Sequence, residues 1–345
     1  MARAAKKASK PVLSEAAKAL MDEASAFNYQ RKAAMAWARG IDHAGSVEVK
    51  PTEGFDLNRT IFTTLQGKLP RAFIGAKISK SVFWNDKAIA KIEDAYQQTR
   101  SESEIPDVNP ALLDFMVDEC DFSMEHADGT FLEHLVFCHD YSALHFPEYS
   151  PTVMLLHSIL GTGTNTFAMQ ASKIERLRGL LTDFEYSHIE AFPSILRLLA
   201  NLDILDELNA NLHRLKDLKS VEFYRVIDNA PLSMNAEDFW IQLNYQLVHY
   251  VDFLPVANWG AYVADPLIQQ LSLLSTFLDR AGKRMATVRF EKPSWTKSVV
   301  GETQSTVSKI SMFLPPAVTR KMASKAIKQF SAQIGHDLSY RLVWS

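Results

Sequence analysis

Histidines and acids gather in one stretch of this 345-residue chain. Five of the ten histidines lie there: His126, His134, His139, His145 and His157. Aspartates and glutamates share the stretch, from Asp114 to Asp140. Imidazole and carboxylate ligands together suit iron, manganese or zinc, whereas a chain with two cysteines offers no thiolate site. The sequence therefore predicts a metal site with nitrogen and oxygen ligands.

Helical spacing singles out two of these histidines. In a helix expected over residues 130–146, steps of four, three and four place four side chains on one face: His134, Cys138, Tyr141 and His145. His139 points away from that face, because five residues advance a helix by about 140°. His157 ends the apolar run VMLL and must point inward or lie at a helix C-terminus. We expect His134 and His157, on adjacent antiparallel helices, to begin the metal site. A hydrogen-bonded core or surface role is the alternative for each.

Two further pairs at one-turn spacing are candidates to complete the site. Glu185 precedes His188 by three residues, a spacing that lets one carboxylate and one imidazole bind the same ion. His249 and Asp252 have the same spacing on a later helix. Polar residues of the core show this spacing as well, so the sequence leaves both interpretations open.

Three segments in the first half of the chain carry a family resemblance. They are ALLDFMVDECDFSMEHADGTFLEHL from residue 111, HFPEYSP from residue 145 and VMLLHSILG from residue 153. Together with the upstream Phe62-Thr63-Thr64, they resemble the first half of the myo-inositol oxygenase branch of the HD-domain superfamily, over residues 60–162. The resemblance implies an HD-domain-like helical bundle, with its core at residues 108–260.

The same resemblance implies roles for individual residues. His134 matches the first histidine ligand, and His157 matches the histidine of a His-Asp ligand pair. Ser158 stands where the family has the paired aspartate, and a neutral hydroxyl does not replace a carboxylate that bridges two metal ions. Either the site is rebuilt, with one metal ion, or the fold persists without its chemistry. Iron is the expected cofactor, as one or two ions, and manganese and zinc stay open.

Three functions are compatible with these residues. The leading hypothesis is a metal-dependent, non-haem iron oxygenase-like enzyme that acts on a small organic substrate. The second is a non-catalytic helical interaction protein with a decayed metal site, which Ser158 favours. The third is a metal-dependent phosphohydrolase on the same scaffold, because one fold can host both chemistries.

Composition argues against other classes of protein. The 37 basic and 40 acidic residues give a net charge of -3, which provides no general attraction to nucleic acid or anionic lipid. No uninterrupted apolar run reaches the ~18 residues of an integral membrane segment. Two cysteines, Cys120 and Cys138, fit a reducing compartment, so we expect a cytoplasmic protein. The basic, acid-free residues 1–10 leave organellar targeting open.

The elements that must position these residues are predicted to be helices. Ser14 is a good N-cap, and three capping residues followed by proline mark further helix starts: Asn109-Pro110, Ser150-Pro151 and Asp265-Pro266. Leucines at steps of three and four from Leu198 to Leu218 predict one helical stripe that packs in the core. No stretch predicts a confident strand, and nothing indicates a sheet of several strands. We therefore expect an all-α fold, a single compact multi-helix domain.

The chain divides into three expected parts. Residues 1–11 form a basic disordered tail, and residues 12–290 form the all-helical domain. Residues 291–345 form an irregular arm that contains a short basic helix after Pro316. That helix carries four cations: Arg320, Lys321, Lys325 and Lys328. We expect it to be solvated, with contact to an acidic partner or a membrane surface as the alternative.

Overall fold

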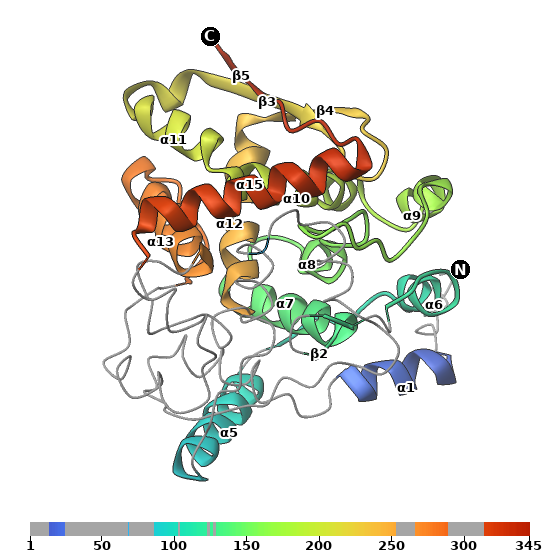
Figure 1. Ribbon diagram of the computed structural model, residues 1–345. Coiled ribbons are helices and arrows are strands. Elements are labelled where there is room, and N and C mark those ends of the chain that lie inside the picture. The colour runs from blue at the N-terminus through green and yellow to red at the C-terminus, as the bar shows by residue number, and fades with distance from the viewer. Residues whose placement is uncertain are drawn as a thin grey trace, which may run out of the picture.

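The computed structural model describes residues 14–24, 68, 86–102, 104–122, 125–126, 129–252, 266–288 and 314–345. The described part is mostly helical, with a small three-stranded sheet (Figure 1). Its α-helices are α1 (Glu15–Ala24), α5 (Asp86–Ser101), α6 (Pro110–Glu119), α7 (Phe131–His145), α8 (Thr152–Leu156), α9 (Ile174–Arg178), α10 (Asp183–Asn201), α11 (Asp203–Ala210), α12 (Ala236–Asp252), α13 (Pro266–Ala281) and α15 (Pro316–Ile334). Short 3-10 turns span Ala171–Lys173 and Leu212–Asp217. The predicted tail and Phe62-Thr63-Thr64 lie outside the described residues.

The predicted helix starts are confirmed where the structure describes them. The side chain of Asn109 accepts a hydrogen bond from the N–H of Ala111 at 3.0 Å, and α6 begins at Pro110. Ser14 caps α1 in the same way, through the N–H of Ala17. Helix α13 begins at Pro266. Helix α8 begins at Thr152, one residue later than predicted, with Pro151 rather than Ser150 as its N-cap and no side-chain cap. Short-range capping decides the starts of α1 and α6, so a single sequence is enough to locate them.

Helices α7, α8, α10 and α12 pack against one another at the centre of the molecule. Their inward side chains include Leu135, Leu155, Ile195 and Val248, which are all fully buried. Burying each such side chain contributes about 1.5–3 kcal/mol through the hydrophobic effect. Among the helices that the structure describes, none has the length and apolar character needed to cross a membrane.

The sheet corrects the expectation that no strands would pair. Its order is β4-β3-β5, all antiparallel, formed by β3 (Leu218–Tyr224), β4 (Pro231–Asn235) and β5 (Arg341–Trp344). A separate two-stranded ladder pairs β1 (Glu125–His126) with β2 (Gly129–Thr130). The register shifts between Leu218 and Ser220, so the buried residues of β3 do not alternate strictly. That irregularity hides the period of two by which a strand is recognised.

The leucine stripe is buried as predicted, but it does not belong to one helix. Helix α10 ends at Asn201, and Leu202 takes a left-handed conformation with φ of 69°. The chain then continues through α11 and a 3-10 turn before Leu218 starts β3. Leu198, Leu202, Leu205, Leu208, Leu215 and Leu218 are all buried. Core packing is therefore confirmed, and the single continuous helix is wrong.

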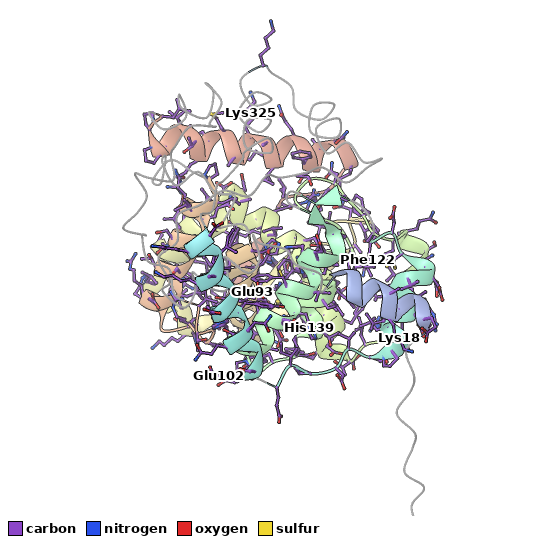
Figure 2. The ribbon with its side chains drawn as sticks, turned by 90° about the horizontal axis from the view of Figure 1, so that it is seen from below. Lys18, Glu93, Glu102, Phe122, His139 and Lys325 are labelled. Atoms are coloured by element: carbon purple, nitrogen blue, oxygen red, sulfur yellow. The ribbon has the colours of Figure 1, made fainter. Side chains whose placement is uncertain are left out.

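The C-terminal segment packs into the body of the molecule. The predicted basic helix is present as α15, which contacts α10 and α13, and β5 pairs with β3 (Figure 1). The buried guanidinium of Arg197 on α10 joins the two parts by donating to the hydroxyl of Ser331 at 3.1 Å. Figure 2 shows α15 as an outer layer, with Lys325 on its exposed side. Residues 316–344 thus do not form a separate arm, and residues 289–313 lie outside the described part.

Candidate metal centre

Helix α7 and the C-terminal end of α8 bring His134 and His157 together in the core. His134 lies on α7 between the buried side chains of Phe131 and Leu135, while His157 directly follows α8 and keeps a helical φ of -53°. Both histidines are 0% exposed. Their Nε2 atoms face each other at 3.0 Å. The predicted inward direction of His157 is therefore confirmed.

The hydrogen bonds on the other ring nitrogens define the tautomers. The Nδ1 of His157 lies 2.6 Å from the carbonyl oxygen of Met154, which can only accept, so this Nδ1 carries a hydrogen. The Nδ1 of His134 lies 2.6 Å from Oδ2 of Asp252 and donates to that carboxylate. In neutral imidazoles of this tautomer, both Nε2 atoms carry a lone pair. Two lone pairs that face each other at 3.0 Å repel, unless both bind one cation beside them or one ring is protonated.

Burial favours the neutral form of the His157 ring. Desolvation lowers the pKa of His157 to about 4, and the hydrogen bond to the Met154 carbonyl opposes this shift only in part. A neutral imidazole with a free Nε2 lone pair is the form that binds transition metals. The electrostatics of the core therefore match the requirements of a ligand.

His249 and Asp252 close the site from α12. Asp252 is fully buried and accepts the hydrogen bond from His134. The ring of His249 packs edge-on against both histidines, with centroid distances of 5.2 Å to His134 and 4.6 Å to His157. Phe192 of α10 contacts the rings of His157 and His249 and provides the apolar wall. The structure thus brings four of the six predicted site residues together.

Cys138 joins this group, which corrects the exclusion of a thiolate site. Its Sγ lies 3.8 Å from Nδ1 of His134, one helical turn away on α7. His134, Cys138 and His157 each offer one ligand atom within 4.8 Å of the others, and this buried group could hold a metal ion. Counting cysteines in the chain missed it, although the spacing of four residues from His134 placed Cys138 on the same face. His139 contacts Asp140 and does not belong to this group, which agrees with the prediction that it points away from the His134 face.

Glu185 does not reach this group, because it serves as part of a helix cap. The side chain of Thr182 accepts from the N–H of Glu185, while the Glu185 carboxylate accepts from the N–H and hydroxyl of Thr182. The hydroxyl of Ser150 donates to it at 2.7 Å. Partial burial raises the pKa of this carboxyl, but these hydrogen bonds outweigh it and lower the pKa overall. The carboxylate of the predicted Glu-x-x-His pair is therefore already occupied.

His188 lies one turn before Phe192 and faces a different partner. Its Nδ1 is 2.7 Å from Oε1 of Gln242 on α12, and its Nε2 is 3.9 Å from Oδ1 of Asp238. Burial lowers the pKa of His188, and the contacts to Gln242 and Asp238 oppose that shift. Of the predicted ligands, Glu185 and His188 thus lie outside the His134–Cys138–His157 group.

Ser158 occupies a buried position directly beside His157. Its hydroxyl is a weak, neutral ligand that cannot bridge two cations as a carboxylate does. The donor set around His134 and His157 therefore fits one ion better than two.

Comparison of the chain with protein-family models, with curated proteins and with solved structures finds no match in any of the three.

Proposed function

We propose that this protein binds one divalent transition-metal ion through Nε2 of His134 and Nε2 of His157. The observation that carries this proposal is the pair of facing Nε2 atoms at 3.0 Å. Two nitrogens bonded to one ion at ~2.1 Å lie about 3.0 Å apart when the bonds form a right angle and about 3.4 Å apart at the tetrahedral angle, so the spacing fits the narrower angle. The thiol of Cys138 is the third candidate ligand. A His134 imidazolium, paired with Asp252 and donating to His157, is the competing arrangement.

The neighbouring side chains have supporting roles in this proposal. The carboxylate of Asp252 accepts from Nδ1–H of His134, which holds the ring in the tautomer with a lone pair on Nε2 and raises the basicity of that nitrogen. The carbonyl of Met154 does the same for His157. Phe192 covers one side of the His157 and His249 rings with apolar surface. This arrangement preforms the ligands before an ion arrives.

We further propose that the centre belongs to an iron-dependent oxygenase acting on a small organic substrate. Iron supplies one-electron and dioxygen chemistry, which no side chain provides. The resemblance of residues 60–162 to the myo-inositol oxygenase branch of the HD-domain superfamily supports this reaction class. The phosphohydrolase alternative is weaker, because Ser158 removes the carboxylate that a two-ion centre needs.

Complete burial of the ligands favours a second candidate, a structural metal site in a non-catalytic protein. Among the described residues, His134, Cys138 and His157 are all 0% exposed. Structural sites are closed by protein ligands, whereas catalytic sites keep one position open for water or substrate. The two candidates share the metal-binding step and differ in whether the bound ion then reacts with oxygen and a substrate.

Titration of metal-free protein with Co²⁺ tests the binding step. We expect one ion per chain, with visible absorption from cobalt and a thiolate-to-cobalt charge-transfer band. Cys138→Ser should abolish the charge-transfer band, and His157→Gln should weaken binding at least tenfold. His213→Ala, which changes an exposed histidine, is the matched control. Equal Co²⁺ binding by wild type and His157→Gln would contradict the proposal.

Oxygen uptake by iron-loaded protein then separates the two candidate functions. The substrates are small polyols, sugars and organic acids, offered with dissolved oxygen. Uptake that depends on one of them and disappears in His157→Gln supports the oxygenase. If iron raises the melting temperature of the protein but no substrate causes uptake, the structural role replaces the enzyme.

A further inference from the structure

The three-stranded sheet has a hollow on the face that is turned away from the helices. Figure 1 shows the sheet at one end of the molecule, where α12 packs against β3 and β4. Val221 and Phe223 of β3 are buried, so the alternation of a strand turns Glu222 and Tyr224 to the other face. Both of these residues line the hollow, and none of the residues around it belongs to a helix. We refer to it as the sheet hollow.

The sheet hollow is large enough for a small molecule. Its volume is about 360 Å³, and it is lined by residues of all three strands and of the segment just before β5. Sites for small molecules have volumes of about 300–1,000 Å³ and combine apolar surface with a few polar groups. The side chains that face the hollow decide which class of molecule fits it.

Glu222 and Arg341 provide the polar groups at the middle of the sheet hollow. They are direct partners across β3 and β5, and Nε and Nη2 of Arg341 both donate to Oε2 of Glu222, at 2.8 and 2.5 Å. Oε1 of Glu222 remains an acceptor and Nη1 of Arg341 remains a donor, because neither bonds to another described residue. The two side chains are 38% and 71% exposed, so a ligand can reach both. The pair carries no net charge.

Hydroxyl groups and apolar surface surround this ion pair. Ser233 is the partner of Glu222 on β4, and Pro231 is the partner of Tyr224. Ser339 lies at the opposite edge, before β5, and all three residues line the sheet hollow. A hydroxyl both donates and accepts hydrogen bonds. The face of a tyrosine ring carries partial negative charge and attracts the slightly positive C–H groups of a sugar ring.

Hydrogen bonds to other elements fix the frame of the sheet hollow. The carbonyl of Tyr224 accepts from the hydroxyl of Ser194 on α10 at 2.6 Å. Oδ1 of Asn229, in the turn between β3 and β4, accepts from the N–H of Asp337 at 2.9 Å. Oδ1 of Asp337 accepts from the N–H of Ser339 at 2.8 Å, which ties that segment to the turn. A frame that is fixed in advance lowers the entropy that a ligand must lose on binding.

We propose that the sheet hollow binds an uncharged ligand with several hydroxyl groups, of the sugar or polyol class. Neighbouring hydroxyls of such a ligand accept from Nη1 of Arg341 and donate to Oε1 of Glu222, while the ion pair stays intact. An anion would have to displace Glu222 from Arg341, and a cation would have to displace Arg341 from Glu222. A solvated surface ion pair without a ligand is the competing interpretation. The sheet hollow shares no residue with the candidate metal centre, so the proposal does not depend on metal.

NMR titration of the ¹⁵N-labelled, metal-free full chain with glucose, maltose and cellobiose tests the proposal. We expect saturable shifts of the amide signals of Tyr224, Ser233 and Ser339. Glu222→Ala should raise the Kd at least about tenfold, because a hydrogen bond to a charged group is lost. Arg320→Ala is the matched control, since it removes another exposed ion pair, with Asp206 at 3.1 Å, and it should leave the Kd unchanged. Circular dichroism checks the fold of both variants.

An array of immobilised glycans, probed with the same protein, separates a free sugar from a sugar chain as the ligand. Binding to the array alone identifies a chain, and shifts with glucose identify a free sugar; both support the hydroxyl chemistry if Glu222→Ala weakens them. Absence of binding in both assays, or an unchanged Kd in Glu222→Ala, would overturn the proposal. So would tighter binding of inorganic phosphate or of betaine at the same amides, because a charged ligand would then be preferred. Loss of the metal centre appears separately, as absence of Co²⁺ binding in protein that still binds a sugar.

Discussion

Acidification of the metal-free protein should lower its stability through His157. The pKa of this histidine falls from 6.5 to about 4 on folding, because burial penalises the charged ring. Well above pH 6.5 the His157 ring is neutral in both the folded and the unfolded chain, so its burial does not lower the free energy of unfolding through protonation. As the pH falls from 6.5 towards 4, the unfolded chain binds a proton that the folded chain does not, and stability decreases. At 1.36 kcal/mol per pKa unit, the loss between pH 7 and pH 5 is about 2 kcal/mol.

Urea denaturation at pH 7 and pH 5, in the presence of a chelator, measures this loss. The matched variant is His157→Gln, whose amide can still donate to the carbonyl of Met154 but does not titrate. Burial also lowers the pKa of His188 and of His336, and these two groups titrate in both proteins. The wild type should therefore lose about 2 kcal/mol more than the variant. An identical pH dependence in the two proteins would show that His157 is not held neutral by the core.

Four other substitutions have defined outcomes. Leu156→Ala removes a fully buried side chain and should lower the free energy of unfolding by about 2–5 kcal/mol in urea, and a change below 1 kcal/mol would contradict the packing. Thr182→Ala breaks the capping box of α10 and should cost about 1 kcal/mol, visible as a lower melting temperature. Asp252→Asn should weaken Co²⁺ binding by about 10–100-fold while circular dichroism stays unchanged, and unaltered affinity would remove Asp252 from the site. Glu185→Gln should leave the metal content of the protein unchanged, because its carboxylate caps α10; loss of metal would restore Glu185 as a ligand.

Local signals in the sequence located much of the helical framework. Asn109 and Ser14 cap helices with their own side chains, and the proline that follows Asn109 allows only a few conformations. The inward direction of His134 and His157 also follows from local spacing, since the period of a helix fixes which residues share a face. These features depend on neighbours within about one turn, which a single sequence contains.

Long-range pairing was harder to predict. Strand β3 pairs with β5 from the C-terminal end of the chain, and its register shift obscures the alternation of buried residues. Pairing of this kind depends on packing against distant segments more than on intrinsic preference. The leucine stripe shows the same limit: burial of Leu202 was evident from the pattern, but its left-handed conformation was not.

The candidate ligands show that spacing along a helix does not decide by itself which side chains can bind a metal ion. Glu185 and His188 have the spacing of a metal-binding pair, yet Thr182 and Ser150 occupy the carboxylate. The count of two cysteines predicts no thiolate site, although one thiolate is enough when two imidazoles lie beside it. Helical spacing identifies side chains that share one face of a helix, and contacts with other elements decide which of them come together in a site.

Elemental analysis of protein purified without a metal-affinity tag, from iron-supplemented cells, tests the central claim most directly. Wild type, His157→Ala and the control His213→Ala are compared, each checked for folding by circular dichroism. We expect one transition-metal ion per chain in the wild type and the control, and a loss of nearly all of it in folded His157→Ala. A wild type without bound metal, or a His157→Ala variant with the full amount, would contradict a metal centre at His134 and His157.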